Sequence, residues 1–405
     1  MEPRPFPPGL ATRRVLLLGA VLLLAAAPAA PAAAAPPTDA EVRQVIDEVV
    51  AIRGIAETAP IPWSVASRAT ALERQLAELD APDARAVLAA EGLVYTRLGL
   101  LPPGTDLHAL VRTALGEQVA GFYDTETRSL TVLDDDGTFD VLDRIVLAHE
   151  AVHALQDMRW DLQEGLDAIP PDAVDRALAY RALVEGDASL GMLLWGTKHA
   201  AADLADTAGG PGLPDDATLA ALPPVVGQQL LSPYVDGLGF LFRAFGAGGW
   251  PAVDATWESP PVSMEQVLHP ELHPDHLPIP VALPDDLAAR LGPGWTERAR
   301  LTLGELIAAV WFADGAPFPA LALGLGPRPL PGGAAAAGWG GDRIVALDGP
   351  DGAYALAWRT TWDTAADAAE AAAAAQAALA DLPGAHVVTE ADPGVPELAH
   401  PVRIL

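Results

Sequence analysis

The segment LAHEAVHALQD, residues 147–157, restricts the fold of this chain more than any other stretch. Residues four apart lie one above the other on an α-helix, so His149 and His153 point in the same direction. Unpaired imidazoles would be costly on a buried face, so the pattern predicts a core helix whose two histidines share a ligand. Apolar residues lie on or beside the same face of the predicted helix: Leu142, Ile145, Val146 and Val152.

A metal ion is the ligand that this spacing favours. In an H-E-x-x-H helix the two histidines bind zinc. Glu150 points about 100° away around the helix, where it can reach a metal-bound water without being a ligand. The chain has no cysteine, so nitrogen and oxygen must hold any metal. The sequence therefore predicts Zn²⁺ as the cofactor. The alternative is two core or surface histidines on an ordinary helix.

Catalytic zinc needs a third protein ligand and an open position for water. No third histidine follows closely, so we expect a carboxylate from another helix. Glu185 lies within the next long helical pattern, among apolar neighbours and beside Gly186, whose missing side chain permits close helix approach. The alternative ligand is Glu164, which lies in the connection between the helices. The alternative for Glu185 itself is a position on a solvated helix face.

HEAVH followed by E-G-x-A on the next long helix resembles the gluzincin branch of zinc metallopeptidases, in the exported bacterial, peptidase-MA-like form. The match covers about residues 117–246, including AGFYDTETRSLTVL before the HExxH helix and YVDGLGFLFRAFG after it. The resemblance implies an α+β fold, with a mostly helical zincin-like domain and a β-hairpin above the HExxH helix. It also implies zinc ligation by His149, His153 and Glu185, with Glu150 as the general base.

The chain departs from two subgroups of that clan. It lacks the G-x-M-E-N element with which aminopeptidases grip a free amino terminus, which favours an endopeptidase. It also lacks the N-E-x-x-S-D arrangement of thermolysin-like enzymes, so the second partner of a zinc-binding histidine must come from elsewhere. Asp157 and Asp187 are the candidates; the alternative for each is a helix-face charge.

The oxyanion formed during peptide hydrolysis needs a donor besides zinc, from outside the two ligand helices. Tyr234 is the candidate, because similar Tyr-x-x-Gly segments in related aminopeptidases supply a catalytic tyrosine hydroxyl. The alternative is an aromatic side chain in the core stripe of the predicted helix at residues 225–245. His269 and His199 are the reserve candidates.

Other functions compete with the peptidase hypothesis. Glu150-x-x-His153 and Glu397-x-x-His400 both fit the E-x-x-H pattern of a di-iron carboxylate protein, although the second lies in a Pro-flanked tail. A catalytically inactive, exported zinc-binding protein is the other alternative. We expect only adventitious metal binding by the three histidines of LHPELHPDH, residues 268–276, which is predicted to be an extended loop.

The amino terminus resembles a secretory signal, with three arginines, an apolar run at residues 15–27 and small residues that end at Ala35. We therefore expect an exported protein, extracellular or in the cell envelope, without stable membrane insertion after cleavage. An uncleaved N-terminal anchor is the alternative. The net charge of −30 disfavours binding to nucleic acid, so the expected partner is a peptide or protein substrate.

The predicted organisation follows from these segments and from the Pro/Gly-rich stretches between them. It comprises a signal peptide at 1–35, a helical lead-in at 36–116, the zincin-like domain at 117–312 with a loop at 201–224, a linker at 313–341, and a small α/β module at 342–405. Within it we expect a capping box at Thr38 and Glu41, helices at 64–79, 82–97, 139–160 and from an Asp172 N-cap to 195, a hairpin at 119–133, a capping box at Thr364 and Asp367, and a strand at 386–389.

Overall fold

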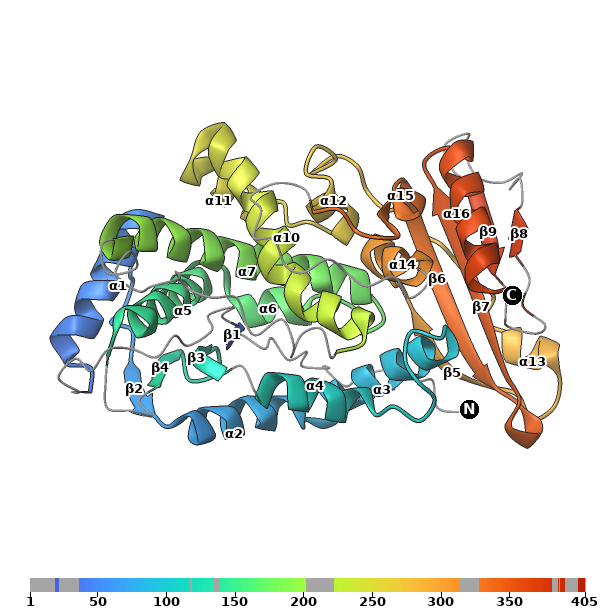
Figure 1. The fold of residues 1–405 in the computed structure, drawn as a ribbon, viewed down its shortest axis with the longest axis horizontal. Coiled ribbons are helices and arrows are strands. Elements are labelled where there is room, and N and C mark those ends of the chain that lie inside the picture. The colour runs from blue at the N-terminus through green and yellow to red at the C-terminus, as the bar shows by residue number, and fades with distance from the viewer. Residues whose placement is uncertain are drawn as a thin grey trace.

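The computed structural model describes residues 19–21, 36–116, 119–133, 139–201, 222–313, 328–380, 385, 387–389 and 400–404. These residues form a mixed α+β fold that is mostly helical, as the sequence predicted. One end of the molecule holds a four-stranded sheet and the long helices α1 (Asp39–Arg53), α5 (Val141–Trp160) and α7 (Val174–Trp195) (Figure 1). The other end holds a five-stranded sheet with α16 (Ala365–Ala378) (Figure 1).

The four-stranded sheet has the order β1-β3-β4-β2. The predicted hairpin is confirmed, because β3 (Val119–Asp124) and β4 (Ser129–Leu133) pair antiparallel with Tyr123 opposite Leu130. β2 (Trp63–Ala66) pairs with β4 in parallel, and β1 (Gly19–Val21) pairs antiparallel with the outer edge of β3. The rest of the predicted signal peptide lies outside the described residues.

The helix predicted at residues 64–79 begins later than predicted. Residues 64–66 belong to β2, and α2 begins only at Arg68, after a Ser67 N-cap. The edge of β4 offers main-chain partners to this segment, and a pairing so distant in sequence overrides the weak local helical pattern.

Four long helices build the core, and the hairpin packs against one of them, α5. α1 (Asp39–Arg53) and α5 (Val141–Trp160) both begin with a capping box, which is the predicted Thr38–Glu41 pair at α1. α5 packs against α1, α7 (Val174–Trp195) and the hairpin, while α7 also packs along α10 (Pro224–Gly248). A Cβ atom on Gly186 would lie 2.4 Å from the carbonyl oxygen of Gly237, so these two glycines let α7 and α10 touch backbone to backbone.

Asp172 is not the N-cap of α7, contrary to the prediction. The N-cap is Ala173, which makes no side-chain capping bond. The carboxylate of Asp172 instead accepts a 2.7 Å hydrogen bond from Arg343, and its backbone carbonyl accepts one from Thr302. The start of α7 is therefore held by the five-stranded end of the molecule.

The five-stranded sheet has the order β5-β6-β7-β9-β8, and every pair in it is antiparallel. The sequence placed residues 296–301 in the peptidase domain, but they form β5 and pair with β6 of the tail. The sheet therefore begins before the predicted linker. Buried tryptophans on its strands pack against α14 and α16: Trp339, Trp358 and Trp362. The strands and helices of this end are β5 (Thr296–Leu301), α14 (Gly304–Phe312), α15 (Gly333–Ala336), β6 (Trp339–Asp348), β7 (Tyr354–Trp362), α16 (Ala365–Ala378), β8 (Val387–Thr389) and β9 (His400–Ile404).

The predicted Thr364–Asp367 capping box is present at α16. The strand predicted at residues 386–389 corresponds to β8. The other helical segments are α2 (Arg68–Leu79), α3 (Pro82–Arg97), α4 (Leu107–Gly116), α6 (Leu162–Asp167), a π-helical turn (Gly196–Ala200), α11 (Trp250–Glu258), α12 (Met264–Leu268), α13 (Leu287–Leu291) and a 3-10 turn (Pro350–Gly352). Within the described ranges, none of the helices combines the length and the apolar character that a membrane span requires.

Candidate metal centre

The helix α5 holds the two histidines inside the core, as the sequence predicted. Its N-terminus is fixed by Asp140, whose side chain accepts hydrogen bonds from Leu142 and Asp143 backbone amides. The hairpin lies directly against the helix, since a Cβ on Gly121 would come within 2.7 Å of the Val146 side chain. His149 and His153 are consequently almost inaccessible to solvent, with exposed fractions of 1% and 0%.

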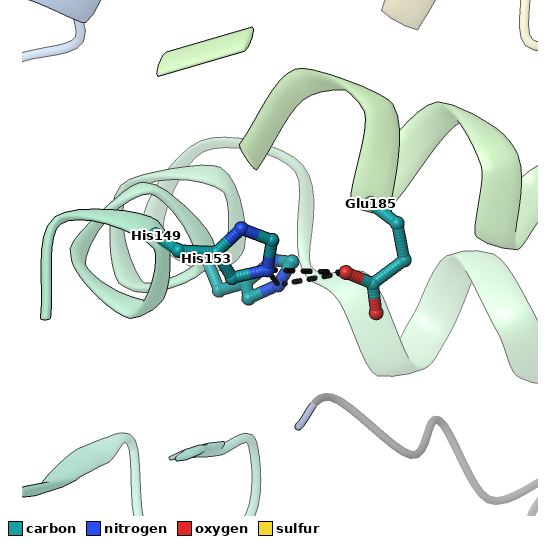
Figure 2. Close-up of side chains that lie close together, drawn as sticks. All are labelled: His149, His153 and Glu185. Atoms are coloured by element: carbon teal, nitrogen blue, oxygen red, sulfur yellow. Dashed lines mark hydrogen bonds and ion pairs between the residues drawn. The ribbon is translucent and has the colours of Figure 1, made fainter. Parts of the chain in front are cut away.

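Glu185 reaches the same site from α7. That helix approaches α5 closely at Gly191, where a Cβ would lie 2.6 Å from a methyl group of Val152. Glu185 is 4% exposed and extends from α7 toward the two imidazoles (Figure 2). Glu164, the alternative ligand, lies on α6 and is exposed, outside the group formed by His149, His153 and Glu185.

The three side chains form a nearly equilateral triangle of donor atoms. His149 Nε2 lies 3.2 Å from Glu185 Oε2, His153 Nε2 lies 3.3 Å from the same oxygen, and the two Nε2 atoms are 3.1 Å apart. Ligands bound about 2.1 Å from a tetrahedral ion lie about 3.4 Å from one another. The residues therefore fit three positions of a tetrahedral zinc shell, in which the fourth position is left for water or substrate.

The charges of the triangle depend on one another. Burial favours the neutral carboxyl of Glu185, but the adjacent His153 and hydrogen bonds from both imidazoles outweigh it and lower the pKa of Glu185 to about 2. Burial likewise opposes the charge on His153, yet Glu185 raises the pKa of His153 to about 9. The carboxylate thus keeps its negative charge, and a bound cation would replace the proton on the imidazole.

A glutamine that the sequence analysis missed orients His153. His153 Nδ1 lies 2.8 Å from Gln156 Oε1, and the Gln156 amide nitrogen donates to the Val184 carbonyl at 3.0 Å. An amide oxygen only accepts, so Nδ1 donates to Gln156, and loss of the Nε2 proton would leave the Nε2 lone pair available to a metal ion. The signal available in the sequence was the position of Gln156, three residues after His153 on the same helix.

Neither predicted aspartate partners a histidine of the site. Asp157 accepts hydrogen bonds from the Tyr123 hydroxyl at 2.8 Å and from the Leu162 amide at 3.0 Å. Asp187 forms an ion pair with Arg53 at the other side of α7. Both carboxylates serve the packing of neighbouring elements, which a sequence pattern along α5 or α7 does not reveal.

Glu150 is buried next to the triangle, on the side of the hairpin. Its Oε2 accepts a 2.7 Å hydrogen bond from the Tyr123 amide of β3. The hydrogen bond ties the carboxylate of the HExxH helix to the outer strand of the hairpin, while the His149 and His153 side chains face α7. Glu150 is thus not one of the three candidate ligands.

Tyr234 on α10 lies beside His149. The two rings are 6.2 Å apart between centroids and nearly parallel, with an interplanar angle of 26°. The crossing of α10 over α7 at the two apposed glycines brings the tyrosine to this place. The tyrosine also packs against the apolar core of the five-stranded end, so both predicted roles remain compatible with its position.

The reserve candidates lie elsewhere. His199 Nδ1 is 3.5 Å from Glu48 and its ring stacks on Trp195, while His269 Nε2 is 2.9 Å from Glu305. In the di-iron alternative, Glu397 lies outside the described residues and His400 is in β9 of the five-stranded sheet.

Comparison with protein families gives a match in the C-terminal part of the chain. The model of DUF8575, a domain of unknown function, matches residues 290–400. The matched segment contains β5 to β8 and the first residue of β9, and it leaves α5 and α7 outside. No curated protein and no solved structure matches the chain.

Proposed function

We propose that this protein is an exported zinc-dependent peptidase, in which His149, His153 and Glu185 bind the metal. The single observation that carries the proposal is the triangle of donor atoms, whose sides of 3.1 to 3.3 Å suit a tetrahedral ion. The gluzincin resemblance of the sequence agrees with it. Zinc in this position would polarise a peptide carbonyl and increase the acidity of a water molecule.

Glu150 acts as the general base. It takes a proton from the attacking water and passes the proton to the leaving nitrogen of the peptide. Its hydrogen bond from the Tyr123 amide holds the carboxylate at the border between the metal ligands and β3. Tyr234, on α10 beside His149, donates a hydrogen bond from its hydroxyl to the oxyanion that develops on the peptide carbonyl.

The outer edge of β3 aligns the substrate as an added antiparallel strand. The support for this step comes from the chain itself, because Gly19–Val21 pairs with that edge, with Gly19 opposite Phe122. These residues belong to the predicted signal peptide. Cleavage after Ala35 would remove them and leave the edge open to a peptide or protein substrate.

The substitution Glu150→Gln tests the proposal. An amide cannot accept the proton of the water, so cleavage of an unstructured protein such as casein should fall by several orders of magnitude while zinc remains bound. Glu164→Gln, on the exposed α6, is the matched control and should cleave at the normal rate. Loss of zinc together with activity would make Glu150 a ligand. A wild-type protein that binds zinc and cleaves nothing would favour the inactive zinc-binding alternative.

A further inference from the structure

A second group of potential metal ligands lies where α12 meets the five-stranded end. Glu265 is on α12, His276 is in the segment that follows this helix, and Asp363 lies between β7 and α16. His276 Nε2 is 3.2 Å from Asp363 Oδ1 and 3.6 Å from Glu265 Oε2. One ligand atom from each residue lies within 4.8 Å of the others.

The carboxylate of Glu265 has no hydrogen bond to satisfy it. The residue is 0% exposed, and both of its oxygens are without a hydrogen-bond partner among the described residues. Of its acidic neighbours, Asp175 accepts a hydrogen bond from the Met264 amide at 3.0 Å, and Glu305 Oε1 is 2.9 Å from His269 Nε2, whereas Glu305 Oε2 has no hydrogen-bond partner among the described residues. A buried carboxylate in such surroundings needs either a proton or a cation.

The position of His276 is built into the fold. The buried Gln266 side chain donates to the His276 carbonyl at 2.8 Å, and the Ile279 amide donates to Gly340 at the start of β6. The segment is therefore tied to α12 on one side and to the sheet on the other. The three histidines of LHPELHPDH have different partners, because His269 pairs with Glu305 and His273 with the Ser259 carbonyl. Adventitious binding by one extended loop, the expectation from the sequence, does not describe this arrangement.

We propose that Glu265, His276 and Asp363 bind a second divalent cation, which joins α12 to the five-stranded end. The separations of 3.2 and 3.6 Å lie on either side of the roughly 3.4 Å expected between ligands of a tetrahedral ion. An imidazole with two carboxylates favours a transition metal such as Zn²⁺ over Ca²⁺ or Mg²⁺, which prefer oxygen ligands alone. The side chains of His276 and Asp363 are about one-third exposed, so water can complete the shell.

Zinc titration of the metal-stripped full chain, in competition with a chromophoric chelator, tests the site. The wild type should bind two equivalents with submicromolar affinity, and His276→Ala should bind one. Glu265→Gln keeps the shape of the side chain and removes its buried charge, so it should fold and also bind one equivalent. His273→Ala is the matched control from the same segment and should bind two.

The substitution His149→Ala separates this site from the proposed active site. The His149→Ala variant should still bind one equivalent of zinc, and the bound zinc should raise the Tm of the variant. Zinc binding and the increase in Tm should both disappear in the double variant His149→Ala/His276→Ala. Equal zinc binding by the wild type, His276→Ala and Glu265→Gln would overturn the proposal. Equal losses in His273→Ala and His276→Ala would also overturn it, because they would indicate adventitious binding by the loop.

Discussion

Glu185 and Asp187 are buried carboxylates two residues apart on α7, yet their surroundings differ. Two residues correspond to about 200° around a helix, so the side chains leave opposite faces. Glu185 faces two imidazoles of α5. Asp187 faces Arg53 of α1, which donates to both of its oxygens at 2.7 and 3.0 Å, and it also accepts from the Trp257 indole at 2.8 Å.

The difference lies in how each charge is balanced. The guanidinium of Arg53 is permanently charged, forms a bidentate pair with Asp187 and stacks over Trp250 at 4.3 Å. Asp187 is therefore fully compensated by the protein. Glu185 instead has two imidazoles within 3.3 Å, which balance its charge when they carry a proton or share a cation. Burial alone does not identify a metal ligand; the identity of the partner does.

Removal of a histidine should have the largest effect. His149→Ala or His153→Ala takes away one of two nitrogen ligands, so zinc should leave the α5–α7 site and peptidase activity should fall on the order of 10⁴-fold or more. Zinc content by mass spectrometry and casein cleavage measure both effects. His108→Ala, in α4, is a control that should keep the metal and the activity. Full zinc occupancy of the α5–α7 site in either variant would refute the assignment.

Asp187→Asn should act on stability instead. The neutral amide removes one of the two carboxylates that pair with the buried Arg53 and leaves only Asp254, at 2.8 Å, which should lower the free energy of unfolding by about 3 kcal/mol. Zinc binding to the folded variant should remain normal. Denaturant unfolding measures the first effect, with Asp167→Asn on the exposed end of α6 as the control. If the variant lost zinc at unchanged stability, the two carboxylates of α7 would not have separate roles.

Tyr234→Phe keeps the ring that lies beside His149 and removes only the hydroxyl. If that hydroxyl stabilises the oxyanion, turnover should fall roughly 10²-fold, with zinc content and Tm unchanged. The comparison of kcat for this variant with kcat for Tyr354→Phe, an exposed tyrosine of β7, checks the effect. Normal turnover would assign Tyr234 to the core.

Gln156→Ala should have the smallest effect. It removes the acceptor that orients His153, so zinc affinity should weaken roughly 10- to 100-fold without a change in stoichiometry. Gln163→Ala, on the exposed side of α6, is the matched control for a competitive zinc titration. Unchanged affinity would mean that the fold orients His153 without the amide.

Local sequence signals predicted the elements that carry the site. Capping boxes, the turn of the hairpin and the spacing of His149 and His153 act within a few residues, and the structure reproduces them. The same kind of signal pointed to Glu185, since a carboxylate among apolar residues of a long helix needs a partner, and the structure has it beside His149 and His153.

Contacts between distant segments were not predictable in the same way. β2 and β5 are strands because β4 and β6 offer them main-chain partners, and neither pairing leaves a local pattern. The structural role of Asp187 depends on Arg53, which is 134 positions away in the sequence. Gln156 was missed for a different reason, because a neutral amide near the proposed metal site resembles any other polar helix residue until its two hydrogen bonds are known.

Metal-dependent cleavage by the wild-type protein, without the predicted signal peptide, tests the central claim most directly. Casein digestion is measured after removal of metal by a chelator and again after addition of Zn²⁺, alongside Glu150→Gln under the same conditions. We predict that digestion stops in the stripped protein, returns with zinc in the wild type, and does not return in Glu150→Gln. Digestion that continues without metal, or that Glu150→Gln performs at the wild-type rate, would contradict the account.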